Sequence, residues 1–146
     1  MLIQSTWLPR FALWGSYPNL ILILICLTGI LKGPFWGGFS GGLIGITLGL
    51  LDQHFLLSFS VWLLFGVFFG LLKSNLFNNL KALSALSCLL GTWLLYFIYW
   101  TLSAFFSKEA YYLPWEIPLF NSLLNGLVAY ILFPLFRSGL GLRNNE

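Results

Sequence analysis

Long apolar runs, separated by only a few charged residues, dominate this sequence. Of its 146 residues, 59% are hydrophobic and 8% are charged, whereas about a quarter of the residues in a soluble domain carry a charge. Seven Lys and Arg with four Asp and Glu are too few to cover the surface of a water-soluble globule. The composition therefore predicts an integral membrane protein, and it excludes a soluble enzyme and a nucleic-acid-binding domain.

Five of the apolar runs have the composition of membrane-spanning helices. A spanning helix needs about 20 apolar residues, within a range of roughly 17–25. The runs are continuously apolar, which differs from the alternating pattern of a transmembrane barrel. We therefore predict an all-α, polytopic transmembrane helix bundle that forms a single domain over residues 1–146. The five spans are expected at about residues 18–31, 35–51, 55–72, 82–106 and 117–136.

Residues 1–16 have the pattern of an amphipathic helix rather than of a full span. The apolar side chains that recur there at helical spacing are Ile3, Trp7, Phe11 and Trp14. If this segment crossed the membrane, Arg10 would lie near the middle of the bilayer, and Pro9 would disturb the helix. We expect a short helix that lies in the membrane interface or enters only part of the bilayer.

Basic residues gather on one side of the membrane when the five spans are threaded through it. The side that carries the C-terminus receives Lys32, Lys73, Lys81, Arg137 and Arg143. The other side receives Arg10 and Lys108 together with Asp52, His54, Glu109 and Glu116. Because cytoplasmic loops are enriched in Lys and Arg, we predict that the C-terminus is cytoplasmic.

Glycine spacing is the strongest local signal. One row of glycines recurs every four residues in the second expected span, and a shorter row follows in the third. Small residues at this spacing allow a second helix to approach closely in lipid. The two rows either pack the helices of the protein's own bundle or bind a helix of a partner protein. The glycines concerned are Gly37, Gly41, Gly45 and Gly49 in the second span, and Gly66 and Gly70 in the third.

Two asparagines in the fifth expected span are candidates for a polar site inside the membrane. Asn121 and Asn125 are one helical turn apart, so their amides share a face of the helix. They either hydrogen-bond to a neighbouring helix or line a pocket for a small molecule. The residues that could supply such a pocket are Asp52, Trp93, Tyr96, Asn121 and Asn125.

Asp52 and His54 bring an acid and an imidazole together at an expected helix end. A cap, a turn or an interface anchor fits this position, and no third ligand accompanies the pair to make a metal site. No serine lies in a nucleophile motif. We therefore expect no catalytic residue, no metal and no cofactor. Cys26 and Cys88 lie within apolar runs, where thiols act as small hydrophobic side chains.

Taken in order, these features resemble the MreD family of rod-shape-determining proteins. That family has a proline and a polar residue at the start of one helix, and then a glycine-rich helix of the form G-F-x-x-G-L-x-x-D. Its C-terminal helix contains an asparagine and a late proline. The resemblance covers about residues 18–137, and residues 1–16 are shorter than the full first helix of family members. The residues that carry it are Pro18-Asn19-Leu20, Gly37-Gly38-Phe39-Ser40-Gly41-Gly42-Leu43-Ile44-Gly45, Leu50-Leu51-Asp52, Asn121 or Asn125, and Pro134.

The resemblance implies a scaffold of the bacterial cell-elongation machinery in the inner membrane. Such a scaffold associates with the MreC protein and, directly or through it, with the MreB filament and with RodA and its penicillin-binding transpeptidase. The family has no established catalytic residues. In its six-helix plan the MreD family also resembles the S-components of energy-coupling-factor transporters, which implies the alternative of a small-molecule-binding subunit of a vitamin transporter.

Overall fold

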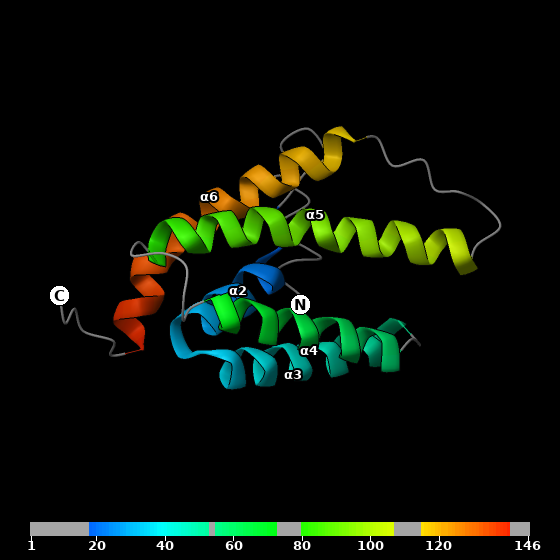
Figure 1. Cartoon of the computed structure of the whole chain (residues 1–146), viewed down its shortest axis with the longest axis horizontal. Helices are drawn as coiled ribbons and strands as arrows, with labels where there is room; N and C mark the ends of the chain where they lie inside the picture. Colours follow the sequence, from blue (N-terminus) through cyan, green and yellow to red (C-terminus); the bar gives the residue numbers. More distant parts are fainter. Residues whose placement is uncertain (1–17, 53–54, 73–79, 107–114, 141–146) are drawn as a thin grey trace.

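The computed structural model describes residues 18–52, 55–72, 80–106 and 115–140. Within these ranges the chain forms five helices and no strand. Successive long helices run in opposite directions, which gives an antiparallel bundle (Figure 1). The helices are α2 (Leu20–Lys32), α3 (Pro34–Asp52), α4 (Phe55–Leu72), α5 (Leu80–Phe106) and α6 (Glu116–Gly139).

Clear local signals set both ends of α2. At its start, the Asn19 side chain accepts a hydrogen bond from the Leu22 amide at 3.2 Å, which is the usual action of an N-cap asparagine. At its end, Gly33 adopts a φ of 99°, a backbone conformation that residues with a Cβ rarely take. The Gly33 amide donates a hydrogen bond to the Gly29 carbonyl at 2.7 Å. Pro34 then begins α3 at once, at a position where a missing N–H costs no helical hydrogen bond.

Four of the helices, α3 to α6, are long and apolar enough to cross a membrane. Only 33–39% of the residues in these four segments are buried, so most of their residues keep some exposed surface, as residues in contact with lipid would. The first expected span is different, because α2 has 13 residues and a full span needs roughly 17–25. The expectation of five full spans is therefore not confirmed.

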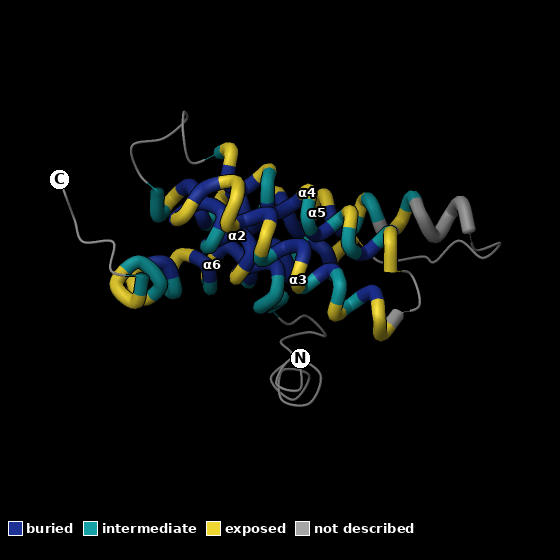
Figure 2. The backbone as a smooth tube through the Cα atoms, turned by 90° about the horizontal axis from the view of Figure 1, so that it is seen from below, coloured by how far each residue is buried: buried dark blue, intermediate teal, exposed yellow. Residues whose placement is uncertain are grey.

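The short helix α2 lies at the centre of the bundle. It packs against each of the other four helices, with α3 and α4 forming one antiparallel hairpin and α5 and α6 another. Buried residues gather along the middle of the bundle (Figure 2). In α2 they include most of the helix: Leu22, Ile23, Ile25, Cys26, Leu27, Gly29, Ile30 and Leu31. A helix this short therefore holds the two hairpins together.

The bounds of the long helices agree with the expected spans to within a few residues. The third span is found at residues 55–72, as expected, and α6 continues past Pro134 to Gly139. Near this proline α6 turns away from its earlier direction (Figure 1), since an internal proline removes a helical hydrogen bond. The expected interfacial helix at residues 1–16 lies outside the described residues, as does His54.

The two thiols of the chain meet in the core between α2 and α5. Cys26 and Cys88 have no exposed surface, and the two side chains are neighbours in the core. Cys26 also donates to the Ser84 carbonyl at 3.7 Å.

We expect the folded protein in mild detergent to protect both thiols from a maleimide by at least ~100-fold, because reaction requires the bundle to open. Denaturation in dodecyl sulfate should expose Cys26 and Cys88 together. Mass spectrometry of the labelled chain after timed quenching measures the protection. Rapid labelling of the folded protein would contradict this packing.

Candidate functional site

The glycine row of α3 lies directly against α4. A Cβ at Gly41 would collide with the Trp62 carbonyl, a backbone group that cannot rotate away. At Gly45 a Cβ would lie 2.7 Å from the Phe59 Cα atom. A Cβ at Gly37 would collide with the Gly66 carbonyl, and a Cβ at Gly49 would lie 2.6 Å from the Phe55 Cα atom. The row therefore allows two helix backbones to touch along their length.

The two expected glycines of α4 complete this contact from the other side. Gly66 faces the Gly37 backbone, and Gly70 faces Pro34 at the start of α3. Gly29 of α2 joins them, since a Cβ there would lie 3.0 Å from the Gly70 amide nitrogen. Because α4 occupies this face of α3, a partner helix could reach it only by displacing α4.

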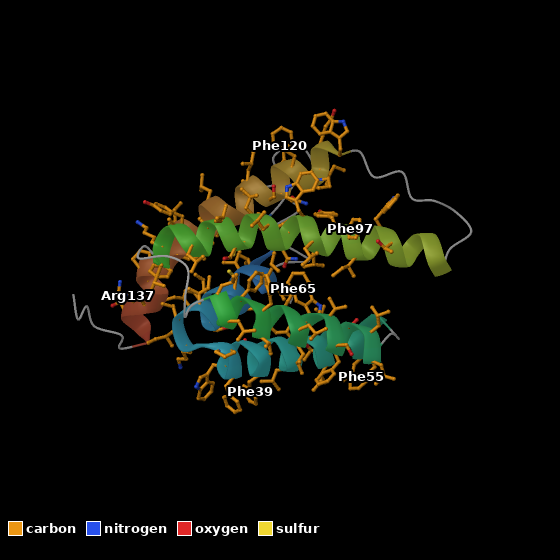
Figure 3. All side chains as sticks on the ribbon, viewed as in Figure 1. Phe39, Phe55, Phe65, Phe97, Phe120 and Arg137 are labelled. Carbon is orange, nitrogen blue, oxygen red and sulfur yellow. The ribbon has the colours of Figure 1, made fainter. Side chains whose placement is uncertain are left out.

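The opposite face of α3 is exposed and rich in aromatic side chains. We define the α3 outer face as Phe35, Trp36, Phe39 and Leu43, whose exposed fractions lie between 49% and 75%. Phe39 points away from the bundle (Figure 3). Its ring and that of Phe35 both meet the Trp36 ring edge-on, at centroid distances of 6.1 and 5.9 Å. The Lys32 ammonium lies 5.0 Å above the Trp36 ring, an attractive cation–π distance.

Asn125 joins three helices by hydrogen bonds and is completely buried. Its side-chain oxygen accepts from the Asn19 amide, at the start of α2, at 2.6 Å. Its side-chain nitrogen donates to the Thr92 hydroxyl of α5 at 2.8 Å. That hydroxyl donates in turn to the Cys88 carbonyl, one turn earlier in α5, at 2.7 Å.

The position of Asn125 answers a specific need of α2. The first amides of a helix have no partner within the helix, and inside a bilayer there is no water to hydrogen-bond with them. Because α2 is shorter than a full span, one of its ends lies within the bundle. The Asn19 and Asn125 side chains supply acceptors there, to the Leu22 and Asn19 amides respectively.

Asn121, one turn earlier in α6, is only partly hydrogen-bonded. Its side-chain nitrogen donates to the Tyr96 hydroxyl of α5. Its side-chain oxygen is buried and has no hydrogen-bond partner in the part of the chain that the structure describes. The residue as a whole is 9% exposed. Buried polar atoms are hydrogen-bonded in the great majority of cases, so an exception of this kind marks a candidate binding atom.

The structure thus brings together three of the five residues suggested for a polar pocket. Tyr96, Asn121 and Asn125 lie where α5 and α6 meet. Trp93 is 40% exposed on α5. Asp52 is the last residue of α3, a helix that packs mainly against α2 and α4.

Thr92 and Asn19 belong to this group but were not among the candidates from the sequence. A cap pattern was readable at Asn19, which precedes an apolar run. Thr92 gives no comparable signal, because hydroxyl side chains inside apolar helices commonly bond to their own backbone. Elsewhere in the bundle, the hydroxyls of Thr28 and Ser40 form a hydrogen bond of 2.9 Å that links α2 to α3.

No group of three or more His, Cys, Asp or Glu side chains within the described ranges could hold a metal ion. The geometry therefore offers two features with functional meaning, the α3 outer face and the partly bonded amide of Asn121. Comparison with protein-family models, with curated proteins and with solved structures finds no match to this chain.

Proposed function

We propose that this chain is a non-catalytic membrane scaffold of the bacterial cell-elongation machinery, of the MreD kind. It binds an MreC-type protein and, directly or through it, the MreB filament and RodA with its penicillin-binding transpeptidase. The resemblance of residues 18–137 to the MreD family supports this choice of partners. The structural observation that supports it is the α3 outer face, an aromatic surface on a helix held firmly from behind.

The glycine contacts and the α3 outer face act together in this proposal. Gly41 and Gly45 bring α3 into backbone contact with α4, which limits how far α3 can shift or rotate. A surface that is rigid before binding loses less entropy when a partner binds. Aromatic side chains such as Trp36 and Phe39 are also the kind that supplies much of the energy of protein interfaces.

The proposed location is the bacterial inner membrane, with the C-terminus in the cytoplasm. Lys32 ends α2, Lys81 begins α5 and Arg137 lies in the last turn of α6. These three ends lie at the same end of the bundle (Figures 1 and 3), while Glu116 begins α6 at the other. The enrichment of basic residues on cytoplasmic sides supports this orientation. In it α2 serves as a fifth, shortened passage.

The scaffold proposal predicts which helix face a partner needs. Alanine at both Phe39 and Leu43 should lower recovery of the MreC-type protein with the tagged chain at least ~10-fold, because two large side chains leave the interface. The matched control is alanine at Leu56 and Leu64 of α4, which are 76% and 64% exposed. Both double variants should keep the unfolding temperature of the wild type.

Quantitative mass spectrometry of crosslinked, affinity-purified membranes measures this recovery. Equal recovery of the MreC-type protein with wild type and with the Phe39 and Leu43 variant would rule out the α3 outer face. Absence of the MreC-type protein and of the cell-wall synthases from wild-type preparations would overturn the scaffold function itself.

A second function, a small-molecule-binding subunit like the S-components of vitamin transporters, is favoured by one observation. Tyr96, Asn121 and Asn125 converge between α5 and α6, as polar groups do in a pocket. Recovery of a transport ATPase and its coupling subunit, in place of the MreC-type protein, would establish that function.

A further inference from the structure

The buried side-chain oxygen of Asn121, which has no hydrogen-bond partner among the described residues, can be compared with that of a second asparagine on the same face of α6. Asn125 lies one turn away, and its oxygen and nitrogen both have partners, Asn19 and Thr92. Within the described ranges, only the side-chain nitrogen of Asn121 is hydrogen-bonded, to the Tyr96 hydroxyl. Both polar atoms of the Asn125 side chain therefore form hydrogen bonds that hold the bundle together, whereas the Asn121 side chain contributes such a bond through its nitrogen.

The place of Asn121 in the bundle adds a second observation. The amide of Asn19, where α2 starts, meets Asn125, and Asn121 lies one turn of α6 closer to Glu116, at which α6 begins. At 1.5 Å per residue, Asn121 lies roughly 8 Å along the axis from that end. This buried oxygen therefore lies about one helical turn of α6 from the amino-terminal end of α2.

The chemistry around the free oxygen selects an uncharged ligand. The Asn121 amide is bonded to a neutral group that can both donate and accept a hydrogen bond, the Tyr96 hydroxyl, and the next amide on this face of α6, Asn125, is neutral as well. A buried ammonium would need a carboxylate to balance its charge. A hydroxyl or an amide can donate one hydrogen bond to the Asn121 oxygen, through its O–H or N–H, without adding a charge.

We infer that Asn121 and Tyr96 form a binding site, at the amino-terminal end of α2, for the hydroxyl or amide group of a small amphiphilic molecule. Two sources provide this chemistry. A lipid with a glycerol headgroup presents hydroxyls at the membrane surface, and a free molecule presents the same type of group on an apolar body. The inference goes beyond the scaffold function and does not depend on it.

The lipid source is tested with the full chain in phosphatidylcholine nanodiscs. One preparation contains added phosphatidylglycerol, and the other contains phosphatidylmethanol, which has the same phosphodiester charge but lacks the glycerol hydroxyls. We expect phosphatidylglycerol to raise the unfolding temperature, followed by tryptophan fluorescence, by about 3 °C over phosphatidylmethanol. This difference should disappear in Asn121→Leu and Asn121→Met. It should remain in Ser122→Ala, because the Ser122 hydroxyl donates to the Leu119 carbonyl of its own helix.

The free source is tested with benzamide against acetophenone, which has the same carbonyl but no N–H. If benzamide stabilises the wild type and acetophenone does not, and if this effect is lost in Asn121→Leu and kept in Ser122→Ala, the site binds a free molecule. If neither phosphatidylglycerol nor benzamide acts through Asn121, the inference is wrong. Loss of partner recovery would leave this outcome unchanged, so the site and the scaffold function fail separately.

Discussion

Replacing Gly41 by alanine is expected to destabilise the folded protein by about 3 kcal/mol, whereas the same change at Gly42 should alter stability by no more than about 1 kcal/mol. At Gly41 the new Cβ would meet the Trp62 carbonyl, with its carbon at 2.9 Å. Backbone atoms of this kind move only if α3 and α4 separate. At Gly42 the nearest atom is a ring carbon of Phe59 at 3.4 Å, which can shift by a few tenths of an ångström.

The two glycines make a matched pair because they are adjacent in one helix. Both substitutions raise helix propensity by the same amount, up to ~1 kcal/mol, so the difference between them isolates the contact with α4. Unfolding in mixed micelles of increasing dodecyl sulfate, followed by tryptophan fluorescence and by thiol exposure, measures it. Equal stability of Gly41→Ala and Gly42→Ala would show that α3 and α4 do not touch at this point.

Larger substitutions should act through folding before they act through any partner. Leucine at Gly41 or Gly45 adds several carbons where even one does not fit, so we expect loss of folded protein from the membrane. Normal expression and folding of Gly45→Leu, with loss of the MreC-type partner, would instead mean that the partner binds this face and that α4 does not.

The sequence was informative about this contact because its cause is local. Glycine every fourth residue forms a flat strip on one side of a helix, whatever lies opposite. The strips at Gly37–Gly49 and Gly66–Gly70 therefore identified two faces, and the third span was predicted with its observed bounds, 55–72. Which helix covers each strip could not be predicted from spacing, because a partner helix and a helix of the same chain require the same pattern.

The length of α2 and the roles of the asparagines depend on contacts between distant residues. Asn19 and Asn125 are 106 positions apart, and no local pattern links them. Asn121 and Asn125 look alike in the sequence, since both are amides on one face of an apolar helix. Their roles differ because α2 begins beside Asn125, one turn away from Asn121. The position at which α2 begins relative to α6 is set by the assembled bundle.

These two asparagines give the second large expected effect. Replacing Asn125 by leucine should destabilise the protein by about 2 kcal/mol, because the Asn19 amide loses its acceptor at 2.6 Å and the Thr92 hydroxyl loses its donor. The same replacement at Asn121 loses the bond to Tyr96 but also removes a buried oxygen that had no partner among the described residues. We expect those two effects to cancel to within about 1 kcal/mol.

The helix, its face and the type of substitution are the same at both positions. The comparison therefore isolates the difference in hydrogen bonding between the Asn125 and Asn121 amides. Dodecyl sulfate unfolding of Asn121→Leu, Asn125→Leu and the wild type under one set of conditions measures it. A larger loss of stability at Asn121 than at Asn125 would mean that the free oxygen is satisfied within the folded chain. Near-wild-type stability at Asn121 would instead leave its amide available for binding, since residues that bind ligands are often suboptimal for the fold.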